Sequence, residues 1–166
     1  MTPSFSPLIR RVATLLFVAA LSTGAAVEAK SPALVLSAGP DAETTVEFTL
    51  EELAEIPQVT VVTLNEFTDA PVSYRGPLMR DVLAFLGLDD IEVVRVYAAN
   101  DYYVDIPTSD FQRYSVILAL EADGARLSRR EKGPLWVMYP MSDHPELRDP
   151  VYNARLIWQV VRIEKI

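Results

Sequence analysis

Apolar and polar positions alternate in short runs along most of this chain, a period typical of half-buried strands. Seven such runs predict strands, at residues 44–48, 58–64, 91–98, 102–106, 116–120, 135–139 and 155–166. The last run is the clearest, because Ile157, Val161 and Ile163 fall on one face. Strands therefore dominate the expected fold.

Two stretches carry helix signals instead. Thr49 with Glu52 three residues later predicts a capped helix start, and Pro57 ends that helix after at most two turns. Pro77 predicts the start of a second helix, which ends at Gly87. Its apolar face would consist of Leu78, Val82, Phe85 and Leu86. A short helical turn is expected at residues 107–113.

Few helices between many strands leave little room for repeated crossover connections. We therefore predict an α+β fold with a β-rich mixed sheet. A dinucleotide-binding fold is not expected, since no Gly-rich loop follows any strand.

The first 29 residues have the pattern of a secretory signal peptide. Arg10 and Arg11 precede an apolar run at 12–21, and Val27 and Ala29 are small residues at the positions that a signal peptidase reads. The run is short for a transmembrane helix, although an uncleaved anchor is the alternative. We expect a periplasmic protein with a signal at 1–29, an extended leader at 30–43 and one domain at 44–166.

Charge and cysteine content narrow the function classes. The formal net charge is −8, and removing residues 1–29 takes away two Arg and one Glu, giving −9. An acidic chain argues against a nucleic-acid partner, because phosphate backbones select basic faces. The chain has no Cys, so its stability must come from a hydrophobic core and not from disulfides.

Several segments, taken in order, resemble the sulfite-oxidase-like molybdopterin-binding domain in its small, stand-alone form. They are Phe48–Leu53, Tyr74–Leu78, Asn100–Pro107, Ile117–Leu120, Asp123–Gly124, Gly133–Leu135, Tyr139–Pro140 and Arg162–Glu164, with Trp158. The resemblance covers nearly all of the chain after the signal. It implies that family's fold and a molybdopterin site near Asn65, Asn100, Asp101, Tyr102, Lys132, Gly133 and Trp136.

This chain departs from the pattern of that family at three places. Active members of the family hold molybdenum through a Cys thiolate, a soft ligand, after the strand that here ends near Leu64. Asn65 or a close neighbour stands in that place. In the family, a His-Gly pair and an Arg help to hold the pterin phosphate. The corresponding positions in this chain are Lys132-Gly133 and Trp136. No cofactor is therefore expected, with molybdopterin as the alternative.

Two further groups of polar residues are candidate binding sites. Arg126, Arg129, Arg130 and Lys132 form a cation patch that would receive an anion or an acidic partner, unless it is a solvated loop. His144, Arg148, Tyr152, Asn153 and Arg155 follow in a long loop that would form a pocket wall. The alternative is that His144 and Asp149 only organise that loop. No metal site is expected, because one imidazole without a thiolate supplies too few ligands.

Three functions stay open from the sequence. The leading hypothesis is an exported, non-catalytic domain that binds a small anionic ligand or a periplasmic protein. The second is an oxidoreductase subunit in which Asn65, Thr68, Asp69 or Ser73 replaces the thiolate with an oxygen ligand. The third is a sensory or accessory protein that uses Arg129, Arg130 and Lys132 to bind an anion or an acidic partner.

Overall fold

The computed structural model describes residues 32–38, 45–85, 87 and 91–166. The predicted signal at 1–29 lies outside these residues. Within them, no helix has the length and apolar character needed to cross a membrane.

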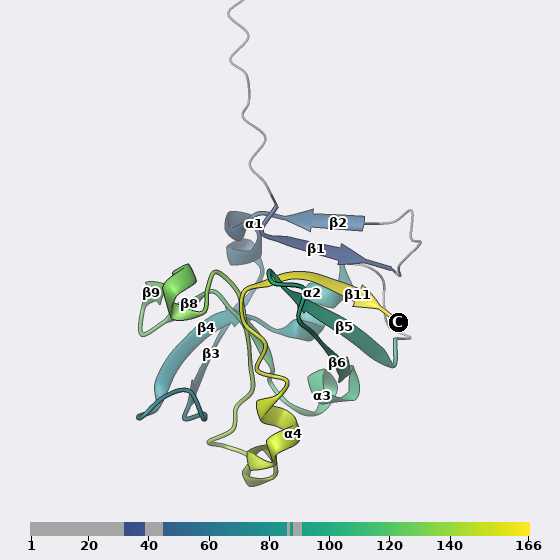
Figure 1. The fold of residues 1–166 in the computed structure, drawn as a ribbon. Coiled ribbons are helices and arrows are strands. Elements are labelled where there is room, and N and C mark those ends of the chain that lie inside the picture. Colours follow the sequence, from purple (N-terminus) through teal and green to yellow (C-terminus); the bar gives the residue numbers. More distant parts are fainter. Residues whose placement is uncertain (1–31, 39–44, 86, 88–90) are drawn as a thin grey trace, which may run out of the picture.

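Three sheets make up the fold, which Figure 1 shows together with its few short helices. A five-stranded sheet has the order β2-β1-β11-β5-β6, a four-stranded sheet the order β3-β4-β8-β9, and β10 pairs with β7. The strands are β1 Leu34–Ser37, β2 Thr45–Phe48, β3 Gln58–Thr63, β4 Val72–Pro77, β5 Val93–Ala98, β6 Tyr103–Pro107, β7 Ile117–Ala119, β8 Glu121–Ala122, β9 Ala125–Arg126, β10 Trp136–Met138 and β11 Val160–Lys165. The helices are α1 Leu50–Glu55, α2 Met79–Ala84, α3 Ser109–Arg113 and α4 Pro150–Asn153, with 3-10 turns at Arg129–Glu131 and Pro145–Arg148.

The prediction of an α+β fold with a mixed sheet is confirmed. All the strand pairs are antiparallel except β1 with β11, which run parallel. Apolar side chains from all three sheets form one buried core. Its largest fully buried members include Tyr74, Phe111 and Tyr139.

Part of the predicted leader at 30–43 belongs to the folded domain. Leu34 and Leu36 of β1 are fully buried, and the strand lies between β2 and β11. Four residues with two inward apolar side chains are too short a run to stand out as a strand in the sequence. The domain therefore begins before residue 44.

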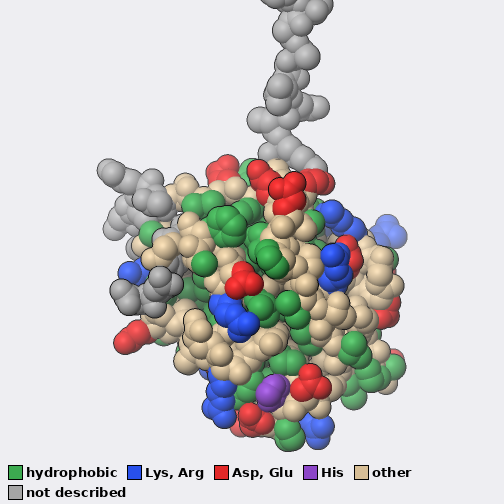
Figure 2. Space-filling view, turned by 180° about the vertical axis from the view of Figure 1, so that it is seen from behind, with side chains coloured by type: hydrophobic (Ala, Val, Ile, Leu, Met, Phe, Trp, Pro, Cys, Tyr) green, Lys and Arg blue, Asp and Glu red, His purple; other side chains and the backbone are tan. Residues whose placement is uncertain are grey.

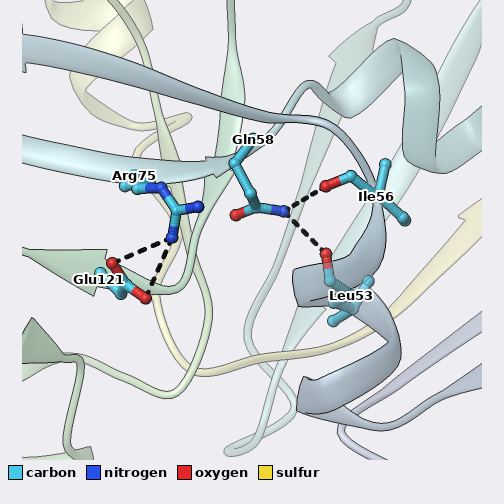
Figure 3. Close-up of polar contacts among 5 residues, drawn as sticks. All are labelled: Leu53, Ile56, Gln58, Arg75 and Glu121. Atoms are coloured by element: carbon cyan, nitrogen blue, oxygen red, sulfur yellow. Dashed lines mark hydrogen bonds and ion pairs between the residues drawn. The ribbon is translucent and has the colours of Figure 1, made fainter.

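The predicted capping box at α1 is confirmed. The Glu52 backbone N–H donates to the Thr49 hydroxyl at 3.2 Å, and the Thr49 backbone N–H donates to the Glu52 carboxylate at 2.7 Å. At the other end, the Gln58 side-chain amide donates to the carbonyls of Leu53 and Ile56 at 2.9 and 2.7 Å (Figure 3). Carbonyls that a short helix leaves unpaired thereby gain partners, which anchors α1 to the start of β3.

The second helix starts later than predicted, because Pro77 is the last residue of β4. No strand was predicted over residues 72–77, so β4 was missed. Gly76 explains its position: a Cβ there would lie 2.0 Å from the Leu118 carbonyl oxygen, so only glycine lets β4 approach β7 this closely. On the exposed side of β4, Arg75 donates to both Glu121 oxygens at 3.3 Å (Figure 3).

The segment between β8 and β10 carries the predicted turns. Asp123 and Gly124 both have positive φ, as a two-residue hairpin between β8 and β9 requires. Lys132 also has a positive φ, 66°, at the end of the 3-10 turn, and the Gly133-Pro134 peptide bond is cis. The Lys132 side chain lies near Trp136 of β10 and near Trp158.

Candidate functional site

Five aromatic and cationic side chains meet where β4, β10 and the loops after β3 and before β11 converge. The Lys132 ammonium lies 5.2 Å from the ring centre of Phe67, 5.4 Å from that of Trp136 and 5.7 Å from that of Trp158. Tyr74 packs edge-on against Trp136 at 5.4 Å. The three distances from the Lys132 ammonium fall within the range of cation–π attraction.

Phe67 and Trp158 carry the exposed part of this cluster. Their rings meet at 5.2 Å and 75°, and Trp158 is 38% exposed. Trp136 is buried, and its indole N–H donates to the Leu156 carbonyl at 3.0 Å. Within the cluster, Trp136 is thus held in the interior, whereas Phe67 and Trp158 are accessible.

Members of this cluster line two cavities in the described part of the chain, and a third cavity lies beside the first. The Trp158 cavity encloses about 410 Å³ and is lined by Glu66, Phe67, Ala98, Asn100, Tyr102, Asn153, Ala154, Leu156, Ile157 and Trp158. The Lys132 cavity, about 400 Å³, includes Phe67, Thr68, Tyr74, Asp123, Arg126, Glu131, Lys132 and Trp136. The Arg148 cavity, about 290 Å³, includes Leu64, Asn65, Glu66, Met141, Ser142, Arg148 and Asn153. Phe67 separates the first two, while Glu66 and Asn153 border the first and third.

The Asn65 side chain is directed into the protein. Asn65 is only 7% exposed; its Oδ1 accepts from the Phe67 backbone N–H at 2.9 Å, and its Nδ2 donates to the Tyr74 hydroxyl at 3.4 Å. The Met138 sulfur lies 3.7 Å from the same Nδ2. Burial raises the pKa of Tyr74, which the hydrogen bond from Asn65 partly opposes. Both ends of the Asn65 amide are therefore engaged within the fold.

Three of the sequence-predicted residues line the Trp158 cavity: Asn100, Tyr102 and Asn153. Asp101 lies in the turn between them, exposed and with positive φ. Lys132 and Trp136 line the Lys132 cavity, whereas Asn65 and Arg148 line the third. Gly133 is buried, and a Cβ there would lie 2.2 Å from the Leu127 carbonyl oxygen, so its role in the structure is close packing. That any of these residues binds a ligand stays a prediction.

Two members of the cation patch, Arg126 and Lys132, line the Lys132 cavity together with Asp123 and Glu131. Lys132 turns to the aromatic rings, while Arg126, Arg129 and Arg130 are exposed and make no ion pair within the described part of the chain. The Arg129 carbonyl accepts from the Gln159 side chain at 3.1 Å. Figure 2, which shows one face of the molecule, has acidic side chains gathered towards the end where β1, β2 and α1 lie.

Three of the predicted pocket-wall residues are used for packing and line none of the three cavities. His144 stacks edge-on against Tyr114 at 5.0 Å, and Tyr152 packs on both Tyr114 and Tyr139. Arg155 donates to the Asp110 carboxylate at 2.6 Å, and the Tyr139 hydroxyl donates to the same oxygen at 2.7 Å. Burial raises the pKa of Tyr139, and the Asp110 carboxylate adds to that effect.

Sequence reasoning did not single out Glu66, Phe67 or Trp158 as site residues. Glu66 and Phe67 lie outside the predicted strands and helices, and Trp158 lies within the strand predicted at 155–166. Neither residue type nor periodicity distinguished these three residues from their neighbours, and in the structure Trp158 pairs with Trp136 only through an isolated bridge. Residues 98–102 and 153–158 converge on the cavity only through the sheet order.

Comparison with known proteins identifies the family. The description of the family model that matches residues 29–142 is "Oxidoreductase molybdopterin binding domain". The chain belongs to this family. No curated protein matches the chain.

The fold of this molybdopterin-binding domain is also found in a solved structure, the sulfane dehydrogenase SoxCD from Paracoccus pantotrophus. The two share 18% sequence identity with a TM-score of 0.58, over 80% of this chain and 37% of that one. The chain thus spans well under half of the SoxCD chain it matches. The likeness extends to the fold alone.

The side chains of this family member fit a molybdenum centre poorly. The sequence has no Cys, and the Asn65 amide at the place expected for a thiolate is engaged with Phe67 and Tyr74. The candidate oxygen ligands do not share one cavity: Asn65 lines the Arg148 cavity and Thr68 the Lys132 cavity, while Asp69 and Ser73 line neither. Among the described residues, no three His, Asp or Glu side chains are grouped to hold a metal ion.

Proposed function

We propose that this protein is a molybdenum-free member of the molybdopterin-binding domain family that binds a small organic ligand in the Trp158 cavity. The observation that carries the proposal is the inward engagement of Asn65. Where the resemblance implies a metal-binding thiolate, an amide instead completes the hydrogen bonding of the Phe67 N–H and the Tyr74 hydroxyl.

Turning Asn65 outward to ligate a metal would be unfavourable. It would leave the Phe67 N–H and the Tyr74 hydroxyl without their partner, and each buried polar group left unpaired costs about 1–3 kcal/mol. A carboxamide oxygen is also a hard, neutral donor, whereas the family's metal site uses a soft thiolate. Both arguments favour a domain that has kept the fold and lost the metal.

The Trp158 cavity has the size and the lining expected of a ligand site. Its volume of about 410 Å³ falls in the range of small-molecule pockets, roughly 300–1,000 Å³. Phe67, Tyr102 and Trp158 supply aromatic surface, and the amides of Asn100 and Asn153 supply directional polar groups. Few polar groups on mainly apolar walls is the usual composition of such sites.

Molybdenum analysis separates this proposal from a molybdopterin-dependent oxidoreductase, which the family description favours. The full chain is produced in cells that synthesise the cofactor, purified from the periplasm, and assayed for molybdenum and for pterin fluorescence. A family member with the thiolate, produced in the same cells, is the positive control. We expect no stoichiometric molybdenum; a loaded chain would overturn the proposal.

Export is a second part of the proposal and rests on the pattern of residues 1–29. Cell fractionation followed by intact-mass measurement tests it. We expect a periplasmic protein whose mass corresponds to a chain starting at Lys30. A membrane-bound protein that keeps residues 1–29 would instead support an uncleaved anchor.

A further inference from the structure

The lining of the Trp158 cavity carries negative charge. Of the residues that the structure describes, Glu66 is the only charged one that lines this cavity, and no Lys, Arg or His among them does so. Within the described part of the chain, the Glu66 carboxylate is exposed and forms no ion pair. Arg148 borders the neighbouring cavity together with Glu66, but no ion pair joins the two side chains. An anion entering the cavity would therefore meet a carboxylate on its lining, whereas the cation nearest in the aromatic cluster, Lys132, lines the adjoining cavity.

The walls of the cavity add to this preference. Phe67 and Trp158 form a corner at 75°, and Tyr102, which is 54% exposed, contributes a third ring. The face of an aromatic ring is its negative side and attracts cations, particularly ammonium ions. The carboxylate and the rings therefore favour the same sign of ligand charge.

The chain itself shows that these rings accept an ammonium group. Lys132 places its ammonium 5.2 Å from the Phe67 centre and 5.7 Å from the Trp158 centre, and it forms no ion pair with a described carboxylate. Lys132 lines the adjoining cavity and not the Trp158 cavity. Its charge thus lies on shared rings, where it would repel a second cation.

We propose that the Trp158 cavity selects small organic ammonium ions, and that Lys132 limits their affinity by occupying the same aromatic cluster. This inference rests on the proposed ligand-binding function and specifies the chemical class of its ligand. It differs from the small anionic ligand expected from the sequence, which relied on the cation patch Arg126, Arg129, Arg130 and Lys132, because no residue of that patch lines the Trp158 cavity.

Three probes of nearly equal shape test the charge preference. Choline, neutral 3,3-dimethylbutan-1-ol and anionic 3,3-dimethylbutanoate are titrated into the full mature chain. Binding is followed by ligand-observed NMR, and by tryptophan fluorescence, since both Trp residues of the chain lie in the cluster. We expect choline to bind about tenfold more tightly than the neutral alcohol, the effect of one desolvated cation–π contact.

Each alternative outcome has a defined meaning. If the alcohol or the carboxylate binds as tightly as choline, the ammonium preference is wrong while ligand binding in the cavity stands. If none of the three binds, the ammonium inference is overturned. Stoichiometric molybdenum in the purified chain would overturn the proposed function itself, and that measurement is independent of the titrations.

Variants with matched controls locate the site. Tyr102→Leu is expected to weaken choline binding several-fold, whereas Tyr103→Leu leaves it unchanged, because Tyr103 stacks under Arg95 outside the cavity. Glu66→Gln is expected to weaken choline binding, with Glu55→Gln as the remote control. Equal effects within either pair would contradict the assignment.

The direction in which Lys132→Gln changes choline affinity tests the proposed role of Lys132. If Lys132 competes for the rings, its removal strengthens choline binding. If Lys132 instead served to bind an anion, removal would leave choline unaffected and weaken the carboxylate probe. Melting curves of every variant establish that the comparison is made between folded proteins.

Discussion

Two polar regions of this molecule, the Asp110 network and the Trp158 cavity, differ in whether their charged groups are buried and paired. In the first, one Asp110 oxygen accepts from both Tyr139 and Arg155, and all three residues are largely withdrawn from solvent. In the second, the Glu66 carboxylate stays exposed and unpaired within the described chain, beside accessible aromatic rings.

The difference separates groups that hold the fold from groups that are available to a ligand. The Asp110 network joins α3, the residue that follows β10 and the segment after α4, which are far apart in sequence. Among the described residues, every buried side-chain nitrogen and oxygen has a hydrogen-bond partner. Unused polar capacity is therefore found at the surface cavities and not in the core.

The largest expected effect comes from removing the shared acceptor. Asp110→Ala leaves the Arg155 guanidinium and the Tyr139 hydroxyl without their partner, and breaking a buried ion pair in this way costs about 3–5 kcal/mol. Because Arg155 keeps some exposure, we expect a loss near the lower end, measured by urea unfolding. Asp105→Asn, which removes a more exposed pair with Arg95, is the control. A similar loss in both variants would mean that burial does not distinguish the two pairs.

An intermediate effect is expected at alkaline pH. The pKa of Tyr139 is raised in the folded protein by burial and by Asp110, so above the ordinary tyrosine pKa the unfolded chain loses a proton that the folded chain keeps. Stability therefore falls as the pH rises above about 10. Tyr139→Phe should be less stable at neutral pH by about 1 kcal/mol for the lost hydrogen bond, yet show a shallower alkaline decline. Unfolding at several pH values checks this, and an unchanged slope would show that Tyr139 is not responsible.

The smallest effect on stability is expected in the Trp158 cavity. Glu66→Gln removes a charge that no described residue pairs with, so the free energy of unfolding should change by no more than about 0.5 kcal/mol. The same variant is expected to weaken choline binding. A large loss of stability would instead show that Glu66 belongs with the structural network, and the comparison would fail.

Part of this picture could be predicted from the sequence because it depends on local patterns. Alternation of apolar residues predicted most of the strands, and Thr49 with Glu52 predicted the capping box that the structure contains. Strands β1 and β4 were missed for physical reasons. β1 has only four residues, and in β4 the decisive feature is the contact of Gly76 with Leu118, a residue more than forty positions away.

The candidate site was harder to predict than the fold. The family resemblance pointed to Asn100 and Tyr102, the long loop after His144 pointed to Asn153, and all three line one cavity. Phe67 and Trp158 gave no local signal, and Arg155 and His144 were expected at a pocket wall but pack against Asp110 and Tyr114. A side chain's neighbours in space decided these roles.

By itself, the sequence determined the α+β class, the family and the missing thiolate, since these depend on residue types and their order. Only the tertiary structure decided that Asn65 faces inward, that the Lys132 ammonium lies near aromatic rings and that Glu66 lines a cavity without an ion pair to any described residue. The reason is that hydrogen bonds and cation–π contacts depend on distances of a few ångströms between residues far apart in the chain. Such distances are set by how the three sheets pack together.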